Sequence, residues 1–229
     1  MRFAALAAIV VAWFYVAPHL PYVGHDWNVF LVSFVVLPGT LLLVLFALPL
    51  SQDRRVWIAT VVFALAALVL SLAGVPLWAN FGKLAAAVCA GWAFLQLFEA
   101  LSWVVLVACI IPFVDIISVW RGPTHSITSK HFHVYLDVAI AFLVPHGSAA
   151  YLGPPDVLFH ALFLAAAWRW RLRPTWTWVA TTGMYALTIV IANATNAGGL
   201  PALPFLSVGF LAANGDLLWH RLRPRPASS

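Results

Sequence analysis

The sequence predicts an all-α protein, a polytopic bundle of about eight transmembrane helices. Of the 229 residues, 64% are hydrophobic and only 8% are charged, whereas soluble domains carry about 25% charged residues. The apolar runs are continuous and do not alternate as the strands of a membrane β-barrel do. Because only helices or a closed barrel satisfy the backbone polar groups in lipid, these runs indicate helices. The composition excludes a disordered chain and a soluble globule.

Each predicted span is an apolar run near the length of about 20 residues that a helix needs to cross a bilayer. The first run resembles a signal peptide, but Pro18-His19-Leu20-Pro21 is a poor cleavage site, so we expect a retained span. Glu99 separates the fourth run from the fifth, because one helix over both would be too long. The predicted spans are residues 3–21, 28–50, 56–79, 83–98, 101–120, 155–172, 176–194 and 200–219.

The chain divides into three regions. Residues 1–82 hold the first three spans, residues 83–220 hold the other spans and the large polar loop, and residues 221–229 form a short basic tail. The loop, residues 121–154, contains one apolar run from Val138 to Val144. Seven residues cannot cross a bilayer as a helix, so this run predicts a short strand or an interfacial segment.

The net charge of +5 indicates membrane orientation, and we expect no nucleic-acid partner, because the arginines lie in short clusters between apolar runs. With eight spans, both termini lie on one side of the membrane. The basic residues of that side are Arg2, Arg54, Arg55, Arg169, Arg171, Arg173, Arg221, Arg223 and Arg225, and those of the other side are Lys83, Arg121 and Lys130. The positive-inside rule then predicts an integral membrane protein with both termini in the cytoplasm.

Two acidic residues point to chemistry within the membrane. Asp115 lies six residues before Arg121, where its span ends, and Asp156 begins the next span. Both carboxyl groups enter from the side of the loop that joins the two helices. Asp156 alone could be a helix cap, because an acid suits the first turn of a helix. Asp115 precedes a helix C-terminus, where the dipole disfavours an anion, so capping does not explain it.

The last span opens with irregular backbone. Pro201 and Pro204 remove two backbone donors near its start, and such backbone is tolerated in a membrane only inside protein or beside a cavity. The simpler interpretation is a helix that begins at a proline.

Together these three elements resemble the presenilin and signal peptide peptidase family of intramembrane aspartyl proteases, over about residues 83–219. In that family an aromatic residue precedes the first aspartate, Gly-x-Gly-Asp opens the next helix, and Pro-Ala-Leu follows two helices later. Here Val114-Asp115 stands for the first motif and Gly153-Pro154-Pro155-Asp156 for the second. Pro201-Ala202-Leu203 matches the third.

The resemblance implies a presenilin-like helical fold, trimmed to eight spans, in which residues 83–220 form the catalytic region. It implies cleavage of transmembrane helices or signal peptides within the bilayer, with Asp115 and Asp156 as the catalytic pair. Gly153, Pro154 and Pro155, with the Pro-Ala-Leu motif at 201–203, would contact substrate. No cofactor or metal is implied.

Two departures from the family pattern matter. Val114 replaces the aromatic residue before the first aspartate, and Pro155 replaces the second glycine. Proline fixes φ and lacks an N–H, so Pro155 either restricts the substrate or indicates a relative that binds membrane proteins without cutting them.

The two carboxyl groups could share one proton and divide the roles of acid and base. The helix dipole suits an anion at Asp156, so we assign Asp156 as general base and Asp115 as protonated acid. We further expect the Val138 to Val144 segment to hold unwound substrate by β-augmentation.

Three histidines are weaker candidates. His160 lies one helical turn after Asp156 and could hydrogen-bond its carboxylate, although a lone histidine on an apolar face is more often a packed core residue. His131 and His133 lack further metal ligands at a suitable spacing. A transporter or channel that uses Asp115 and Asp156 as a proton relay stays an alternative, because ionisable residues within membranes also mark such pathways.

Overall fold

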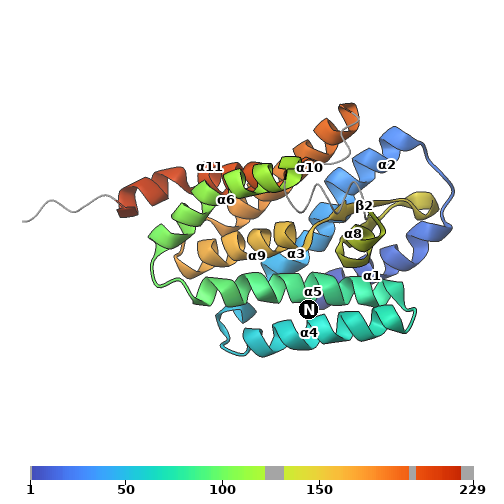
Figure 1. Cartoon of the computed structure of the whole chain (residues 1–229), viewed down its shortest axis with the longest axis horizontal. Helices are drawn as coiled ribbons and strands as arrows, with labels where there is room; N and C mark the ends of the chain where they lie inside the picture. The colour runs from blue at the N-terminus through green and yellow to red at the C-terminus, as the bar shows by residue number, and fades with distance from the viewer. Residues whose placement is uncertain (1, 122–131, 196–199, 223–229) are drawn as a thin grey trace, which may run out of the picture.

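The computed structural model describes residues 2–121, 132–195 and 200–222, and these residues are mostly helical. Figure 1 shows the long helices lying roughly side by side in a bundle. The α-helices are α1 (Arg2–Val16), α2 (His25–Leu31), α3 (Leu37–Ala47), α4 (Val56–Leu72), α5 (Pro76–Gln96), α6 (Leu101–Arg121), α8 (Phe132–Val138), α9 (Pro154–Arg169), α10 (Pro174–Ala194) and α11 (Leu203–Leu222). The strands are β1 (Ile140–Leu143) and β2 (Ala149–Leu152). Short helical turns η1 (Ala17–His19), η2 (Val32–Val36), η3 (Leu48–Gln52) and η4 (Pro145–Gly147) connect or extend them.

The prediction of eight spans is wrong. Within the described part of the chain, three helical segments are long and apolar enough to cross a membrane: Arg2–His19, His25–Gln52 and Leu101–Val119. The second of these joins α2, η2, α3 and η3 end to end. The break predicted near Glu99 is confirmed, because α5 ends at Gln96 and α6 begins at Leu101.

The other five predicted spans are too short or too polar to count as membrane spans. The third ends early, because Gly74 turns the chain with a φ of +71° and α5 begins at Pro76, so α4 has only 17 residues. Helix α9 has 16 residues. The remaining three are long enough but carry many polar side chains, among them Asn80 and Lys83 on α5, the threonines of α10, and Asn214 and Asp216 on α11.

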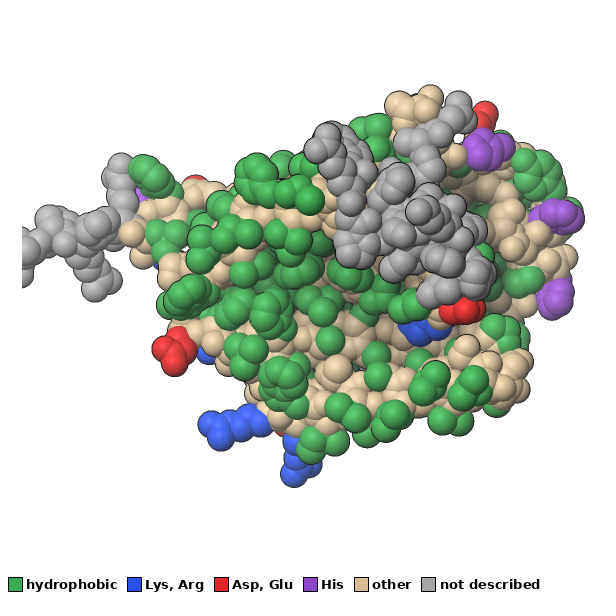
Figure 2. Space-filling model, viewed as in Figure 1, with side chains coloured by type: hydrophobic (Ala, Val, Ile, Leu, Met, Phe, Trp, Pro, Cys, Tyr) green, Lys and Arg blue, Asp and Glu red, His purple; other side chains and the backbone are tan. Residues whose placement is uncertain are grey.

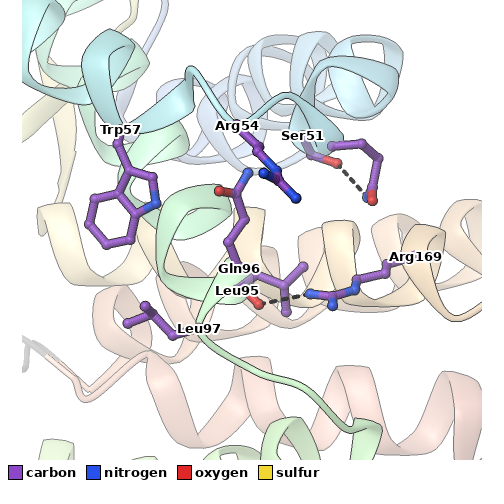
Figure 3. Close-up of a pocket in the computed structure, with 8 residues that line it drawn as sticks. Ser51, Arg54, Trp57, Leu95, Gln96, Leu97 and Arg169 are labelled. Carbon is purple, nitrogen blue, oxygen red and sulfur yellow. Dashed lines mark hydrogen bonds between the residues drawn. The ribbon is translucent and has the colours of Figure 1, made fainter.

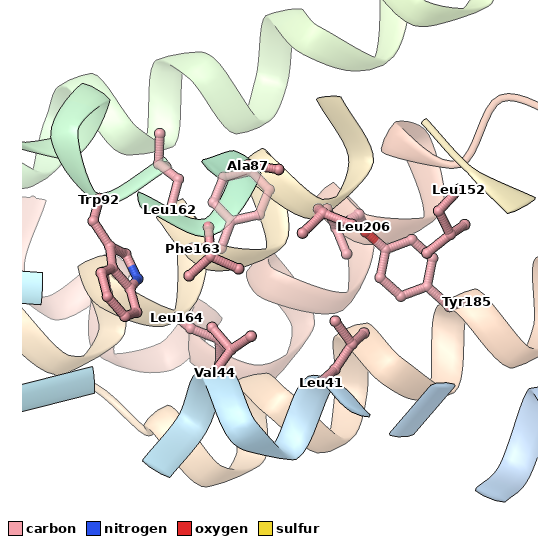
Figure 4. Close-up of a cluster of buried hydrophobic side chains, with 14 of the residues drawn as sticks. Leu41, Val44, Ala87, Trp92, Leu152, Leu162, Phe163, Leu164, Tyr185 and Leu206 are labelled. Carbon is pink, nitrogen blue, oxygen red and sulfur yellow. The ribbon is translucent and has the colours of Figure 1, made fainter. Parts of the chain in front are cut away.

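Helix α9 lies at the centre of the bundle. It contacts α5, α6, α10 and α11, and every residue from Ala161 to Ala167 has no exposed surface. Figure 4 shows Leu162, Phe163 and Leu164 of this helix among apolar side chains of the surrounding helices. A helix that is apolar on all sides avoids water either in a protein core or in lipid, and α9 occupies the core of this bundle.

Glycines allow three helix pairs to approach closely. A Cβ added at Gly91 of α5 would lie 2.2 Å from the carbonyl oxygen of Leu158 on α9. A Cβ at Gly82 would lie 3.0 Å from Ala67 on α4, and one at Gly209 of α11 would lie 3.1 Å from the Ala180 carbonyl on α10. Small residues at contacts between helices are typical of membrane proteins, because lipid does not drive helices together as water does.

The outer surface is apolar over two helices in particular. Helix α4 exposes Ile58, Leu65 and Leu72 among others, and α6 exposes Phe113 and Ile117. Figure 2 shows hydrophobic side chains spread across the visible face, with few charges between them. A water-soluble monomer rarely exposes so large an apolar surface, so this face suits lipid and supports a membrane protein.

The described arginines at the ends of α9 and α11 and beside η3 gather at one end of the bundle. Arg54 and Arg169 line one pocket, Arg221 donates to the carbonyl oxygens of Trp170 and Arg171, and Arg173 pairs with Asp216 at 2.7 Å. We call this region the arginine end; it comprises Arg54, Arg55, Arg169, Arg171, Arg173 and Arg221. The strand region and α2 lie at the opposite end (Figure 1).

Gly91→Ala should destabilise the protein, because the new methyl group would meet the Leu158 carbonyl on the enclosed helix α9. We expect a loss of about 1–3 kcal/mol, typical of an overpacked core, read as a lower thermal unfolding temperature in detergent. Gly183→Ala is the matched control, since nothing lies within 4 Å of its Cβ position on α10. Equal unfolding temperatures for the two variants would contradict the close packing of α5 on α9.

Candidate active site

Asp115 lies on α6, where the half-buried carboxyl group faces the start of α11. Its Oδ2 accepts the backbone N–H of Leu203 at 3.1 Å. Leu203 is the first residue of α11, so its N–H has no partner within that helix. The bond explains how an acid is accommodated near the end of α6: a helix N-terminus of another element supplies the donor.

Asp156 occupies the first turn of α9. Its Oδ2 accepts the N–H of Gly153 at 3.1 Å, so Asp156 caps its own helix as the sequence allowed. Pro154 and Pro155 are the first two residues of α9, where a missing N–H costs nothing. Gly153 has a φ of −65°, which any residue adopts. Pro155 therefore fits this turn without backbone strain.

The fold brings the two acids together. Helices α6 and α9 are in contact, and the carboxyl groups of Asp115 and Asp156 lie close enough to interact electrostatically. In each carboxyl group Oδ2 is held by a backbone N–H, and Oδ1 accepts no hydrogen bond from the described residues. The pair can therefore be positioned by the backbone and still offer one oxygen each to a water molecule or a substrate.

Tyr185 fixes the start of α9 from a neighbouring helix. Its hydroxyl donates to the backbone oxygen of Asp156 at 2.7 Å, and its side chain is fully buried on α10. The charges of both aspartates act on this hydroxyl. Sequence reasoning did not single out Tyr185; the available signal was a tyrosine within a span, since a buried phenol needs a partner.

Tyr135 is a second tyrosine beside the pair. It lies on the short helix α8, outside the spans, and is partly buried. Burial, then the charge of Asp156, then Tyr151 raise the pKa of Tyr135 to about 12. The phenol therefore keeps its proton across the neutral range and is a hydrogen-bond donor next to the acids.

The Pro-Ala-Leu segment lies at the site. Ala202 and Leu203 are buried, and residues 200–202 precede the helix. Through the N–H of Leu203 this segment contacts Asp115 directly. The predicted grouping of Pro201, Ala202 and Leu203 with Asp115 thus describes a contact in the structure, whereas their contact with a substrate stays a prediction.

The predicted strand is present, as β1, and it pairs antiparallel with β2, which the sequence analysis missed. Ala141 is opposite Tyr151, and Leu143 is opposite Ala149. Val144 donates to the carbonyl of Ser148, so by alternation the backbone groups of Ala141, Leu143, Ala149 and Tyr151 point away from the partner strand.

The outer edge of β1 is already occupied by side chains. Asn80 of α5 accepts the N–H of Ala141 at 2.7 Å and donates to its carbonyl at 2.9 Å. Trp13 donates to the Leu143 carbonyl at 2.9 Å, and Lys83 to the Ala139 carbonyl at 3.4 Å. The Val138 to Val144 segment therefore cannot receive a further strand in this state, against our expectation.

The outer edge of β2 has no such cover from the described residues. No described residue is hydrogen-bonded to the outward backbone groups of Ala149 and Tyr151. Strand β2 ends at Leu152 and leads through Gly153 into the turn that carries Asp156. A strand added at this edge would pair with the strand that leads into the Asp156 turn.

The histidines do not join the site in the described structure. His160 is completely buried, its ring centroid lies 5.8 Å from that of Tyr185, and neither ring nitrogen has a hydrogen-bond partner among the described residues. The bond from His160 to the Asp156 carboxylate is therefore absent. His131 and the side chain of His133 lie outside the described residues.

Compared with protein-family models, curated proteins and solved structures, the chain matches none of them. The resemblance to the presenilin family therefore stays a prediction that rests on the three motifs and their order.

Proposed function

We propose that the chain is an aspartic endopeptidase that cleaves transmembrane helices or signal peptides within the bilayer. The observation that carries the proposal is that Asp115 and Asp156, on contacting helices, lie close enough to interact electrostatically. Each has one oxygen held by a backbone N–H and the other unbonded within the described structure. Two adjacent carboxyl groups share one proton because both cannot ionise cheaply. Such a pair can act as base and acid in one step.

In the proposed reaction Asp156 removes a proton from water while that water attacks the scissile carbonyl carbon. Asp115 gives its proton to the carbonyl oxygen. The tetrahedral intermediate then collapses as Asp156 gives the proton taken from water to the leaving amine and Asp115 recovers a proton from a hydroxyl group of the intermediate. Asp156 is the base because the helix dipole at the start of α9 stabilises an anion. The assignment describes one protonation form of a coupled pair, whose shared proton can reside on either carboxyl group.

The proposal places the substrate as a strand on β2. A peptide bond in a helix is shielded by its own hydrogen bonds, so the segment to be cut must unwind and find new partners. The outward backbone groups of Ala149 and Tyr151 supply such partners by β-augmentation. The turn that carries Asp156 follows this strand in the chain.

The orientation proposed for the chain has the arginine end in the cytoplasm, because arginines concentrate on that side of membranes. Helix α11 ends there at Leu222, next to Arg221, so the C-terminus would be cytoplasmic. Helix α1 begins with Arg2, so we propose that the N-terminus shares that side. This orientation requires an even number of crossings, and therefore at least one crossing helix besides the three candidate spans. Reporters fused to each terminus measure the orientation, and a reporter that is active only outside the cytoplasm would contradict it.

Asp115→Asn and Asp156→Asn should each lower the cleavage rate of a single-span substrate by at least about 10²-fold, the usual contribution of an acid or base. Asparagine keeps the volume and can still accept the N–H of Leu203 or Gly153, so fold and substrate binding should persist. The assay uses purified protein in detergent with product masses determined by mass spectrometry. Asp26→Asn is the matched control, because Asp26 lies in the first turn of α2, and we expect normal turnover.

Three outcomes would contradict the protease. Near-normal turnover by the Asp115→Asn variant would show that cleavage does not need this pair of acids. Binding of substrate without any product from wild type would identify a non-cleaving relative, the reading that Pro155 suggests. A proton-coupled flux across vesicles that both asparagine variants abolish would identify a transporter.

Ala149→Pro should weaken substrate binding by roughly 2–10-fold, the worth of one net backbone hydrogen bond. Proline removes the outward N–H of an edge strand and leaves the pairing of β2 with β1 intact. Ala149→Val, which keeps the N–H, is the control, and KM against kcat is measured for both. Equal KM values for the two variants would show that substrate does not pair at this edge. Ala141→Pro is a poorer test, because it breaks the bond to Asn80.

A further inference from the structure

A polar pocket of about 500 Å³ opens at the arginine end, away from the acids. Its walls come from η3 and the start of α4, from the end of α5, and from the end of α9. Figure 3 shows the guanidinium groups of Arg54 and Arg169 pointing into the same space, with Trp57 and Leu97 along one side. The pocket lies near the start of α6, whereas Asp115 is 14 residues beyond Leu101, about 21 Å along that helix.

The lining of the pocket is cationic and rich in hydrogen-bond donors. Arg54 and Arg169 supply two positive charges, and Ser51, Gln52 and Gln96 supply polar groups. The Gln96 amide donates to the Asp53 carbonyl at 2.9 Å and the Gln52 amide to the Ser51 hydroxyl at 3.3 Å. None of the described residues that line the pocket is acidic. Asp53 is not among the lining residues, and its carboxylate accepts the N–H of Arg55 at 2.8 Å. Guanidinium groups bind phosphate through two parallel hydrogen bonds, which suits this set.

The two arginines differ in how they are held. Arg169 donates from one nitrogen to the Leu95 carbonyl at 3.1 Å and lies over the Trp170 ring, so its guanidinium is already oriented. Arg54 makes no hydrogen bond within the described structure, and its side chain is exposed. The oriented guanidinium of Arg169 and the unbonded guanidinium of Arg54 thus face the same pocket, and no described acidic residue lines that pocket.

The pocket also has an apolar side that faces outward. Trp57 is 47% exposed and Leu97 is 60% exposed, and both lie at the junction of polar loops with helices of the bundle. Tryptophan at such a junction is typical of the membrane–water interface. The cationic groups of the pocket can therefore contact a lipid headgroup, and its apolar side can contact the first part of an acyl chain.

We propose that this pocket binds the phosphate of an anionic phospholipid from the leaflet at the arginine end. Arg54 and Arg169 contact the phosphate oxygens, Gln96 contacts the headgroup or glycerol oxygens, and Trp57 and Leu97 pack on the acyl chain. The bound lipid would join η3, α5 and α9 at the end of the bundle opposite the acids. The proposal is independent of the protease proposal.

The test titrates the purified full chain in a neutral detergent with dioleoyl-phosphatidylglycerol, and separately with dioleoyl-phosphatidylcholine and with inorganic phosphate. Binding is read as the rise in thermal unfolding temperature, because a ligand of the folded state stabilises it. We expect phosphatidylglycerol to stabilise wild type and phosphatidylcholine to have a much smaller effect. Equal stabilisation by inorganic phosphate alone would assign the site to a free anion and overturn the lipid.

Arg54→Gln with Arg169→Gln should raise the apparent Kd for phosphatidylglycerol about tenfold or more, given the usual worth of a basic residue at an anionic membrane. Arg55→Gln with Arg171→Gln removes the same charge from the same end outside the pocket and should change Kd less than twofold. Equal Kd values for the two double variants would overturn the site.

The single variant Arg54→Gln controls for misfolding of the double variant. It should fold normally, because Arg54 makes no hydrogen bond to the described protein. It should weaken binding about fivefold on the same scale. An unchanged Kd for a well-folded Arg54→Gln protein would also overturn the proposal.

Discussion

Complete burial of α9 is the constraint on which the rest of the structure depends. The middle of this helix has no exposed residue, so four helices must enclose it, and Gly91 allows α5 to approach its backbone. The enclosed helix begins at the turn that carries Asp156, and Tyr185 fixes that turn from α10. The second acid then needs only to be presented by a helix that contacts α9. Helix α6 does this while it also packs on α11 and leaves an apolar outer face exposed.

The bond between Asp115 and Leu203 completes the arrangement. It uses the free N–H at the start of α11 to hold the carboxyl group of Asp115, and Pro204, the second residue of α11, suits such a helix start. Three separate motifs of the sequence thus meet for one physical reason: helix ends supply unpaired backbone donors, and carboxylates are the groups that such donors hold best.

The sequence predicted the elements that depend on local chemistry. The apolar composition indicated helices, Pro154 indicated the start of α9, and the apolar run after Val138 indicated β1. The number of spans was wrong because composition alone does not reveal where Gly74 and Pro76 cut a helix, or that α10 and α11 bury their polar residues against one another. Strand β2 and the roles of Asn80 and Tyr185 were missed because they depend on contacts between residues far apart in the chain.

The central claim is that α6 and α9 bring the side chains of Asp115 and Asp156 face to face. Its most direct test replaces both with cysteine in a chain that also carries Cys89→Ala and Cys109→Ala, and treats the membrane-embedded protein with a short bifunctional thiol reagent. The account predicts an intramolecular cross-link for this pair. It predicts none for Asp115→Cys with Trp168→Cys, since Trp168 lies near the far end of α9. Failure of the Asp115 and Asp156 positions to cross-link, while both thiols react singly, would contradict the account.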